Sequence, residues 1–244
     1  MSEQVRSMFA EIAPSYDKTN SVLSMGIHHL WRRRAVAASG AKRGDRVLDC
    51  ATGTGDLALG FKAAVGAGGT VVGTDFCAEM METGPAKSAA RGLPVTFEVA
   101  DAMALPYPTG SFDIASISFG IRNVDDPVQA LREMGRVVRP GGRVVVLEFG
   151  QPDGLFGMVY RWYSRVVIPF VGGVLSGQRA AYDYLPRTSA AFPAEGKFVA
   201  LMEQSGAFAS MRFERLSLGI AVLYVGIVGE QKIEGSAETG RSAG

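Results

Sequence analysis

The feature that most constrains this chain is a short apolar segment that runs into a glycine-containing turn and then into a helical pattern, over residues 46–60. We expect a strand over 46–49, a turn that contains Gly53 and Gly55, and a helix over 56–65. Backbone N–H groups at such a turn and at the following helix N-terminus bind part of a nucleotide-like ligand. The unit therefore predicts an α/β domain with a nucleotide-type pocket at the end of its first strand.

An acidic residue lies on each side of the glycines, Asp49 at the strand end and Asp56 in the first turn of the helix. A helix N-terminus carries partial positive charge, and a carboxylate placed there repels the diphosphate of a dinucleotide. S-adenosylmethionine has no phosphate, and its amino and sulfonium groups are cationic, so we predict that it is the cofactor. An alternative for Asp56 is that it only complements the helix dipole.

The turn must also be compared with the dinucleotide fingerprint, because residues 53–58 fit the pattern Gly-x-Gly-x-x-Ala. A second strand is expected over 70–75 and ends with Asp75, about twenty residues after the turn, where an acid accepts hydrogen bonds from ribose hydroxyls. A turn or cap role ahead of a helix near Cys77 is the alternative for Asp75. Adenosine binding is therefore expected, and a nicotinamide-dependent oxidoreductase remains a competing hypothesis.

Composition limits the class of protein. The chain has 244 residues, of which 47% are hydrophobic and 20% charged, as in one α/β domain with a full core. Its net charge of +1 argues against a nucleic-acid partner. The two cysteines, Cys50 and Cys77, are too few and too dispersed for a metal framework, so we expect no metal. The N-terminus lacks an apolar signal core and no uncharged run reaches about 18 residues, which favours a cytoplasmic protein that is at most peripheral at a membrane.

The order of apolar runs predicts the topology. The expected elements are strands over 46–49, 70–75, 95–99, 112–118 and 143–149, with helices over 56–65, 78–91 and 127–138. A helix near 195–205 and two apolar runs, 210–217 and 221–228, follow, and the tight link between these runs predicts an antiparallel pair. Five parallel strands with an antiparallel terminal pair are the layout of the Rossmann-like, seven-stranded class I S-adenosylmethionine-dependent methyltransferases.

Three stretches, 8–34, 116–125 and 136–149, closely resemble the ubiquinone/menaquinone biosynthesis C-methyltransferases, the UbiE family. The specific parts are Ser-Phe-Gly-Ile-Arg-Asn over 118–123 and Tyr-Asp-x-x-Asn from Tyr16, and the likeness extends over about 6–228. The stretch 181–186 resembles the family's substrate-side segment. The chain departs from the family at Ala51-Thr52, where many members carry an additional glycine, so the turn is expected to be slightly stiffer.

The resemblance implies transfer of a methyl group from S-adenosylmethionine to a ring carbon of a polyprenylated hydroquinone, either demethylmenaquinol or the benzoquinol of the ubiquinone pathway. It implies a single methyltransferase domain over 1–230 with an N-terminal helical cap over 1–44 and a substrate-side lid over 151–195. The tail over 231–244 lacks apolar periodicity and is expected to be disordered. The sequence is compatible with a homo-oligomer.

The cofactor contacts follow from the turn and from the resemblance together. The turn itself suggests Asp49, Gly53 and Gly55, and the resemblance adds Thr54, Asp75 at the ribose, Asp101 and Ala102 beside the adenine, and Ser118 at the end of the fourth strand. These positions lie at or just beyond strand ends, where parallel sheets bind ligands. A helix cap is the alternative for Asp101, and an ordinary strand-end hydroxyl is the alternative for Ser118.

Methyl transfer to a ring carbon requires an electron-rich phenolate. Because a phenol such as that of Tyr has a pKa near 10, holding the anion at neutral pH requires about 3 pKa units, or roughly 4 kcal/mol. We assign this role to Arg122 with Asn123, either by stabilising the anion or by orienting a water, since arginine stays protonated. A surface salt bridge at the 125–126 turn is the alternative for Arg122.

Four residues are assigned to the substrate side: Tyr16, His29, Tyr182 and Tyr184. His28 and His29 are the two histidines of the chain, and one of them could act as a base while the other faces away. The alternative is that the histidines belong to a helix packed over the site entrance and that the tyrosines are ordinary buried residues.

The stretch 155–171 mixes aromatic and aliphatic residues with two arginines. It predicts either a lid over an apolar tunnel that touches the bilayer surface or a core helix of the cap. Two further hypotheses stay open, namely a methyltransferase that acts on another small molecule at oxygen or nitrogen and a non-catalytic adenosine-binding module.

Overall fold

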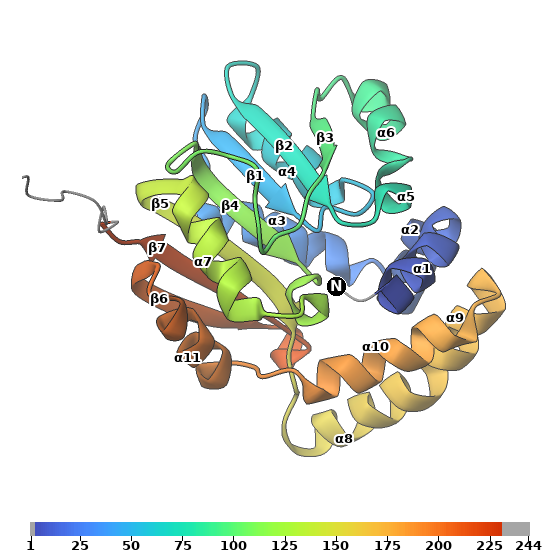
Figure 1. Cartoon of the computed structure of the whole chain (residues 1–244). Helices are drawn as coiled ribbons and strands as arrows, with labels where there is room; N and C mark the ends of the chain where they lie inside the picture. The colour runs from blue at the N-terminus through green and yellow to red at the C-terminus, as the bar shows by residue number, and fades with distance from the viewer. Residues whose placement is uncertain (1–2, 231–244) are drawn as a thin grey trace, which may run out of the picture.

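The computed structural model describes residues 3–230 and contains a seven-stranded sheet with the order β3-β2-β1-β4-β5-β7-β6 (Figure 1). The strands are β1 Arg46–Cys50, β2 Thr70–Asp75, β3 Thr96–Val99, β4 Phe112–Ser118, β5 Val138–Phe149, β6 Phe208–Leu216 and β7 Ala221–Val228. Strands β1 to β5 pair in parallel, and β7 is antiparallel to both of its neighbours. The predicted fold class is confirmed.

Helices cover both faces of the sheet. Helices α3 (Ile27–Ser39) and α4 (Asp56–Val65) bury Trp31 and Phe61 against one face, and α7 (Pro127–Val137) and α11 (Gly196–Ser205) bury Met134 and Phe198 against the other. The remaining helices are α1 Glu3–Ile12, η1 Ala13–Ser15, α2 Tyr16–Leu23, α5 Ala78–Met81, α6 Gly84–Arg91, η2 Ile121–Asn123, α8 Gly154–Trp162, η3 Tyr163–Val167, α9 Ile168–Ser176, α10 Arg179–Ala191 and η4 Ser217–Gly219.

Several element ends differ from the sequence prediction by one or two residues, and two regions differ more. The helix expected over 78–91 is two helices, α5 and α6, because Pro85 lies in the first turn of α6, where its missing N–H and fixed φ suit a helix start and interrupt a continuous helix. Strand β5 starts at Val138 and not at 143, and its register against β4 shifts between Phe112 and Ile114. The parallel core is unaffected by either difference.

A cap of helices α1, α2, α8, η3, α9 and α10 lies on one side of the sheet (Figure 1). Helix α9 packs against α10 and α2, and a small apolar cluster joins the three helices through Leu23, Ile168 and Tyr182. The sequence of the segment 151–195 shows no alternation of strands and helices, and in the structure the segment is mostly helical. The predicted tail over 231–244 lies outside the described residues.

Across residues 3–230, none of the helices combines the length and the apolar character needed to cross a bilayer.

Candidate active site

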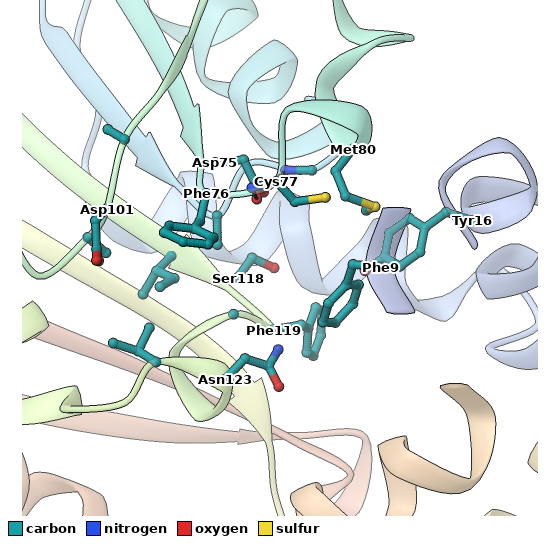
Figure 2. Close-up of a pocket in the computed structure, with 17 residues that line it drawn as sticks. Phe9, Tyr16, Asp75, Phe76, Cys77, Met80, Asp101, Ser118, Phe119 and Asn123 are labelled. Carbon is teal, nitrogen blue, oxygen red and sulfur yellow. Dashed lines mark hydrogen bonds between the residues drawn. The ribbon is translucent and has the colours of Figure 1, made fainter. Parts of the chain in front are cut away.

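A first cavity lies at the carboxyl ends of β1, β2 and β4 (Figure 2). Of the predicted cofactor residues, Gly53, Asp75, Asp101, Ala102 and Ser118 line it. Two predicted residues from other groups line it as well, Tyr16 from α2 and Asn123 from η2. The structure therefore brings together predicted residues that are up to 107 positions apart, between Tyr16 and Asn123, around one cavity.

Asp75 is 8% exposed and ends β2 beside the glycine turn. One carboxylate oxygen accepts a hydrogen bond from Gly53 N at 2.9 Å, and the other accepts one from Cys77 N at 3.0 Å. Burial raises the pKa of Asp75, although these backbone hydrogen bonds oppose the rise. The side chain is thus fixed by the turn, and its carboxylate still borders the cavity, as a ribose diol acceptor requires.

Ser118 is the residue whose surroundings point most directly to a bound ligand. Its hydroxyl lines the first cavity, is buried and has no hydrogen-bond partner in the protein. A buried polar atom without a partner is unfavourable by about 1–3 kcal/mol. A bound polar ligand would satisfy it, so the residues of this cavity fit S-adenosylmethionine.

The loops that follow β1 and β4 adopt backbone conformations that L-residues seldom take. Ala51 has φ 48° and Phe119 has φ 55°, both in the left-handed region. Gly120 lets these loops approach, since a Cβ on it would lie 2.4 Å from the Cβ of Ala51. Such strain is typical of functional sites, and the sequence did not predict the left-handed conformation of either residue.

Three residues of the turn that were predicted as cofactor contacts, Asp49, Thr54 and Gly55, do not line the cavity. Asp49 is 1% exposed and accepts hydrogen bonds from Thr52 Oγ1 at 2.7 Å and Ser116 Oγ at 2.6 Å. Burial raises the pKa of Asp49 to about 6, and these two hydrogen bonds limit the rise. Asp49 therefore stabilises the turn through these hydrogen bonds and does not line the cavity.

Gly55 and Thr54 face neighbouring elements and not the first cavity. Gly55 has φ 83°, and a Cβ there would lie 2.8 Å from the ring of Phe97. Thr54 donates a hydrogen bond to Asp17 at 2.6 Å and accepts one from Lys87 Nζ at 3.0 Å. Thr54 thus joins the turn to α2 and α6.

Asp56 does not face the cofactor cavity, contrary to the prediction from its place beside the glycine turn. Its carboxylate lies 2.6 Å from Lys87 Nζ and 3.2 Å from an Arg32 nitrogen, and it does not line the first cavity. Burial raises the pKa of Asp56, but the hydrogen bond from Lys87 and the charges of Arg32 and Lys87 outweigh burial, so the pKa is lowered overall. Asp56 is already neutralised by the protein, and the carboxylates that border the cavity are Asp75 and Asp101.

A second, larger cavity of about 530 Å³ lies between the sheet and the cap, and its lining is mostly apolar. Tyr16, Tyr182 and Tyr184 line it, as predicted for the substrate side, and so does Arg122. His29, also predicted there, is exposed and does not line the cavity, whereas the neighbouring His28 does.

His28 is 6% exposed, and its Nδ1 is hydrogen-bonded to Ser24 Oγ. Burial, followed by the charge of Arg32, lowers the pKa of His28 to about 4, so the ring is neutral at pH 7. His28, His29 and Asp56 place one ligand atom each within 4.8 Å of one another. However, Arg32 and Lys87 already bind the carboxylate of Asp56, so two cations compete with a metal there.

The two cavities share a wall. Phe9, Tyr16 and Phe119 line both, and Figure 2 shows Phe9 beside Phe119. The hydroxyl of Tyr184, in the second cavity, donates a hydrogen bond to Asn123 Oδ1, in the first cavity, at 3.0 Å. A methyl donor in the first cavity and an apolar acceptor in the second would therefore meet at this wall.

Arg122 is part of a buried ion pair that the sequence did not reveal. Its Nη1 lies 2.9 Å from Glu148 Oε1 at the end of β5, and the two side chains are 5% and 2% exposed. The same Nη1 also donates to the carbonyl oxygen of Phe119, and Nε is buried with no partner. The alternative of a surface salt bridge at the 125–126 turn is wrong, because the Arg122 side chain is buried and pairs with Glu148. The sequence signal for Glu148 is an acid that ends an otherwise apolar strand.

The whole chain is similar to known methyltransferases. The model of the ubiE/COQ5 methyltransferase family matches residues 1–228. The ubiquinone/menaquinone biosynthesis C-methyltransferase UbiE of Bdellovibrio bacteriovorus is 57% identical over 227 residues, which cover 93% of this chain and 96% of that protein. The demethylmenaquinone methyltransferase of Thermus thermophilus is 50% identical over 220 residues, covering 90% of this chain and 99% of that protein.

Solved structures share the fold at low sequence identity. A S-adenosylmethionine-dependent methyltransferase of Thermotoga maritima has a TM-score of 0.64 at 20% identity and covers 91% of this chain and 98% of its own. Another from Aquifex aeolicus has a TM-score of 0.56 at 20% identity and covers 81% and 89%. These structures support the class I methyltransferase fold.

Proposed function

The chain belongs to the ubiE/COQ5 methyltransferase family and is a S-adenosylmethionine-dependent C-methyltransferase of quinone biosynthesis, and from this premise we propose demethylmenaquinol as its substrate. Menaquinone biosynthesis is common to the names of the Bdellovibrio and Thermus relatives. The benzoquinol of the ubiquinone pathway is the second candidate, because the Bdellovibrio relative is named for both pathways.

The observation that carries this proposal is the apolar cavity of about 530 Å³ that shares Phe9, Tyr16 and Phe119 with the cofactor cavity. A prenylated ring is apolar along nearly its whole length, so burial in such a cavity is favourable and removes water from the reacting ring. The lid segment 151–195 and α1 to α3 supply most of the remaining walls. A small polar substrate would leave much of this apolar surface wet.

In the first cavity we propose that Asp75 holds the ribose hydroxyls, that Asp101 and Ala102 contact the adenine, and that the hydroxyl of Ser118 bonds the cofactor. S-adenosylmethionine, when bound, supplies the electrophilic methyl group. The protein's own task is to orient the acceptor ring and to favour its phenolate form, and this task requires no metal ion.

Arg122 is the residue we assign to the phenolate. Glu148 and the carbonyl oxygen of Phe119 hold its Nη1, so the guanidinium has one orientation, while the buried Nε keeps an unused donor. A hydrogen bond from this donor to a quinol oxygen would stabilise the anion in a site with little water. Because Glu148 neutralises part of the charge, the directed hydrogen bond contributes more than the net charge.

Asn123 and Tyr184 are proposed to position the ring at the shared wall. Their hydrogen bond of 3.0 Å links η2 to α10, and burial raises the pKa of Tyr184, so its hydroxyl stays protonated. Tyr182 is proposed to border the same ring from α10. We propose that the enzyme works in the cytoplasm, where it meets its lipid-like substrate at the inner membrane face.

The test is product analysis with methyl-labelled S-adenosylmethionine and two short-chain acceptors, a prenyl naphthoquinol and a prenyl benzoquinol. We expect label on a ring carbon of the naphthoquinol, and Arg122→Ala should abolish turnover while cofactor affinity remains. Label on a quinol oxygen, or turnover of the benzoquinol alone, would refute the proposed substrate. Tight binding of NADH without binding of S-adenosylmethionine would refute the assignment of the cofactor.

A further inference from the structure

An exposed row of large apolar side chains follows the outer side of the cap. Helices α8, η3 and α9 run without interruption from Gly154 to Ser176 (Figure 1). We call the exposed apolar side chains of this helix the apolar stripe: Leu155, Met158, Val159, Trp162, Val166, Phe170 and Val174, which are 51–74% exposed. Their spacing of three or four residues places them on one side of the helix. The opposite side, with Gly157, Ser164 and Gly172, is buried in the cap.

Two turns that are distant in sequence extend this apolar exposure. Met25, between α2 and α3, is 78% exposed with φ 49°, and Leu218, in η4, is 72% exposed with φ 57°. The left-handed region is unfavourable for residues with such side chains, and contact of the apolar side chains with water does not offset that cost. Both residues line the second cavity, together with Val159 and Trp162 of the apolar stripe. The cavity therefore opens to the surface through a rim of exposed apolar side chains.

The charges on this helix have one sign. Between residues 154 and 176 the charged residues are Arg161 and Arg165, with no acid, and both are exposed and line the same cavity. A helix with a broad apolar side and flanking arginines suits an interface between water and an anionic lipid layer. A second protein surface would more often match two arginines with acids than with a continuous apolar row.

We propose that the apolar stripe, with Met25 and Leu218, docks on the surface of an anionic lipid bilayer and places the mouth of the second cavity in the acyl layer. The inference rests on the proposed function, because it explains how a prenyl tail enters without crossing water: the tail slides sideways from lipid into the apolar cavity. Arg161 and Arg165 lie at the level of the lipid phosphates.

The test uses the full chain and vesicles of phosphatidylcholine with or without about a third of phosphatidylglycerol. The test variant is the triple substitution Met158→Gln, Phe170→Gln and Val174→Gln, at exposed positions of the apolar stripe that do not line the cavity. The matched control carries Val99→Gln, Phe213→Gln and Ile227→Gln, which replace three exposed apolar side chains on the strands of the sheet.

We expect the chain to co-sediment with the anionic vesicles more than with pure phosphatidylcholine. The triple variant should lower this partitioning by about tenfold or more, since each lost apolar side chain removes lipid contact, whereas the control should stay within about twofold. Turnover of a long-chain quinol in vesicles should fall in parallel, and turnover of a short-chain quinol in solution should not change.

Absence of vesicle binding, or equal binding by the triple variant, would overturn the proposal. So would a dimer in light scattering that the triple variant converts to a monomer without any effect on vesicles, because the stripe would then join two copies of the chain. If the short-chain quinol is not methylated at all, the proposed function fails, and the vesicle measurements still judge the docking surface separately.

Discussion

The buried pair of Arg122 and Glu148 allows the role of the arginine to be separated from its part in stability. The two side chains are 5% and 2% exposed, and their charged atoms are 2.9 Å apart. Glu148→Gln keeps an oxygen for the hydrogen bonds from Arg122 Nη1 and from Phe149 N, at 2.9 Å each; it removes the charge and the long contact of 3.5 Å from Arg122 N to the other carboxylate oxygen. The variant therefore leaves the guanidinium buried without a counter-ion.

Breaking a buried ion pair from one side costs about 3–5 kcal/mol, whereas replacing both partners by well-packed hydrophobic residues is often nearly neutral, and a buried Gln without a full set of partners adds about 1–2 kcal/mol of cost. We expect Glu148→Gln and Arg122→Met each to lower the free energy of unfolding by about 3 kcal/mol or more. The double variant should lie within about 1–2 kcal/mol of the wild type. Urea denaturation followed by circular dichroism at pH 7 measures all four corners of this cycle.

Catalysis should behave differently from stability in the same cycle. The double variant is expected to be folded and to bind S-adenosylmethionine, yet to turn over quinol at least about 100-fold more slowly, because the hydrogen bond to the phenolate is gone. If the two single losses in stability simply add, the pair is not a buried charge pair as described. If the double variant keeps wild-type turnover, Arg122 does not stabilise the reacting anion.

Three further outcomes follow from other residues. Ser118→Ala should weaken binding of S-adenosylmethionine by about threefold to tenfold in calorimetry, since it removes one hydrogen bond to the ligand. The control is Ser111→Ala: the Ser111 hydroxyl donates a hydrogen bond to the Pro108 carbonyl oxygen at the surface, so its loss should leave the affinity unchanged. The pKa of His28 is about 4 in the fold and 6.5 in the unfolded chain, so the unfolded chain takes up the proton first as the pH falls. The free energy of unfolding should therefore fall by up to about 3 kcal/mol as the pH drops from 6.5 to 4. His28→Asn should remove that part of the pH dependence in urea titrations, and an unchanged pH dependence would exclude His28 as its source. Ala51→Gly should raise the free energy of unfolding by about 0.5–1 kcal/mol by relieving the left-handed φ of 48°, and a loss of stability in urea denaturation would contradict this.

The sheet could be predicted because its signals are local. Strands 70–75, 112–118 and 221–228 have the predicted bounds, since each is an apolar run with turn residues at both ends, and the tight link before β7 allowed only antiparallel pairing. The prediction of one continuous helix over 78–91 was wrong at its centre, because a second helix begins there with Pro85 in its first turn.

The site was less predictable because its contacts are distant in sequence. Residues at strand ends, such as Asp75 and Ser118, line the cavity as topology and the family resemblance together predicted. Topology could not show that Asp56 is neutralised by Lys87, or that Glu148 pairs with Arg122, because both partners come from other elements. For adjacent His28 and His29, only the rotation of α3 decides which ring enters the cavity.

The shared wall makes the N-terminal helices common to both binding events. Phe9 and Tyr16 belong to α1 and α2, and the same two rings border donor and acceptor chambers. A displacement of these helices would change the volume of both cavities, and any effect of one ligand on the affinity for the other must then be reciprocal. If the cavities hold donor and acceptor as proposed, departure of the demethylated donor and loading of the next acceptor would be linked through the rings of Phe9, Tyr16 and Phe119, which line both cavities.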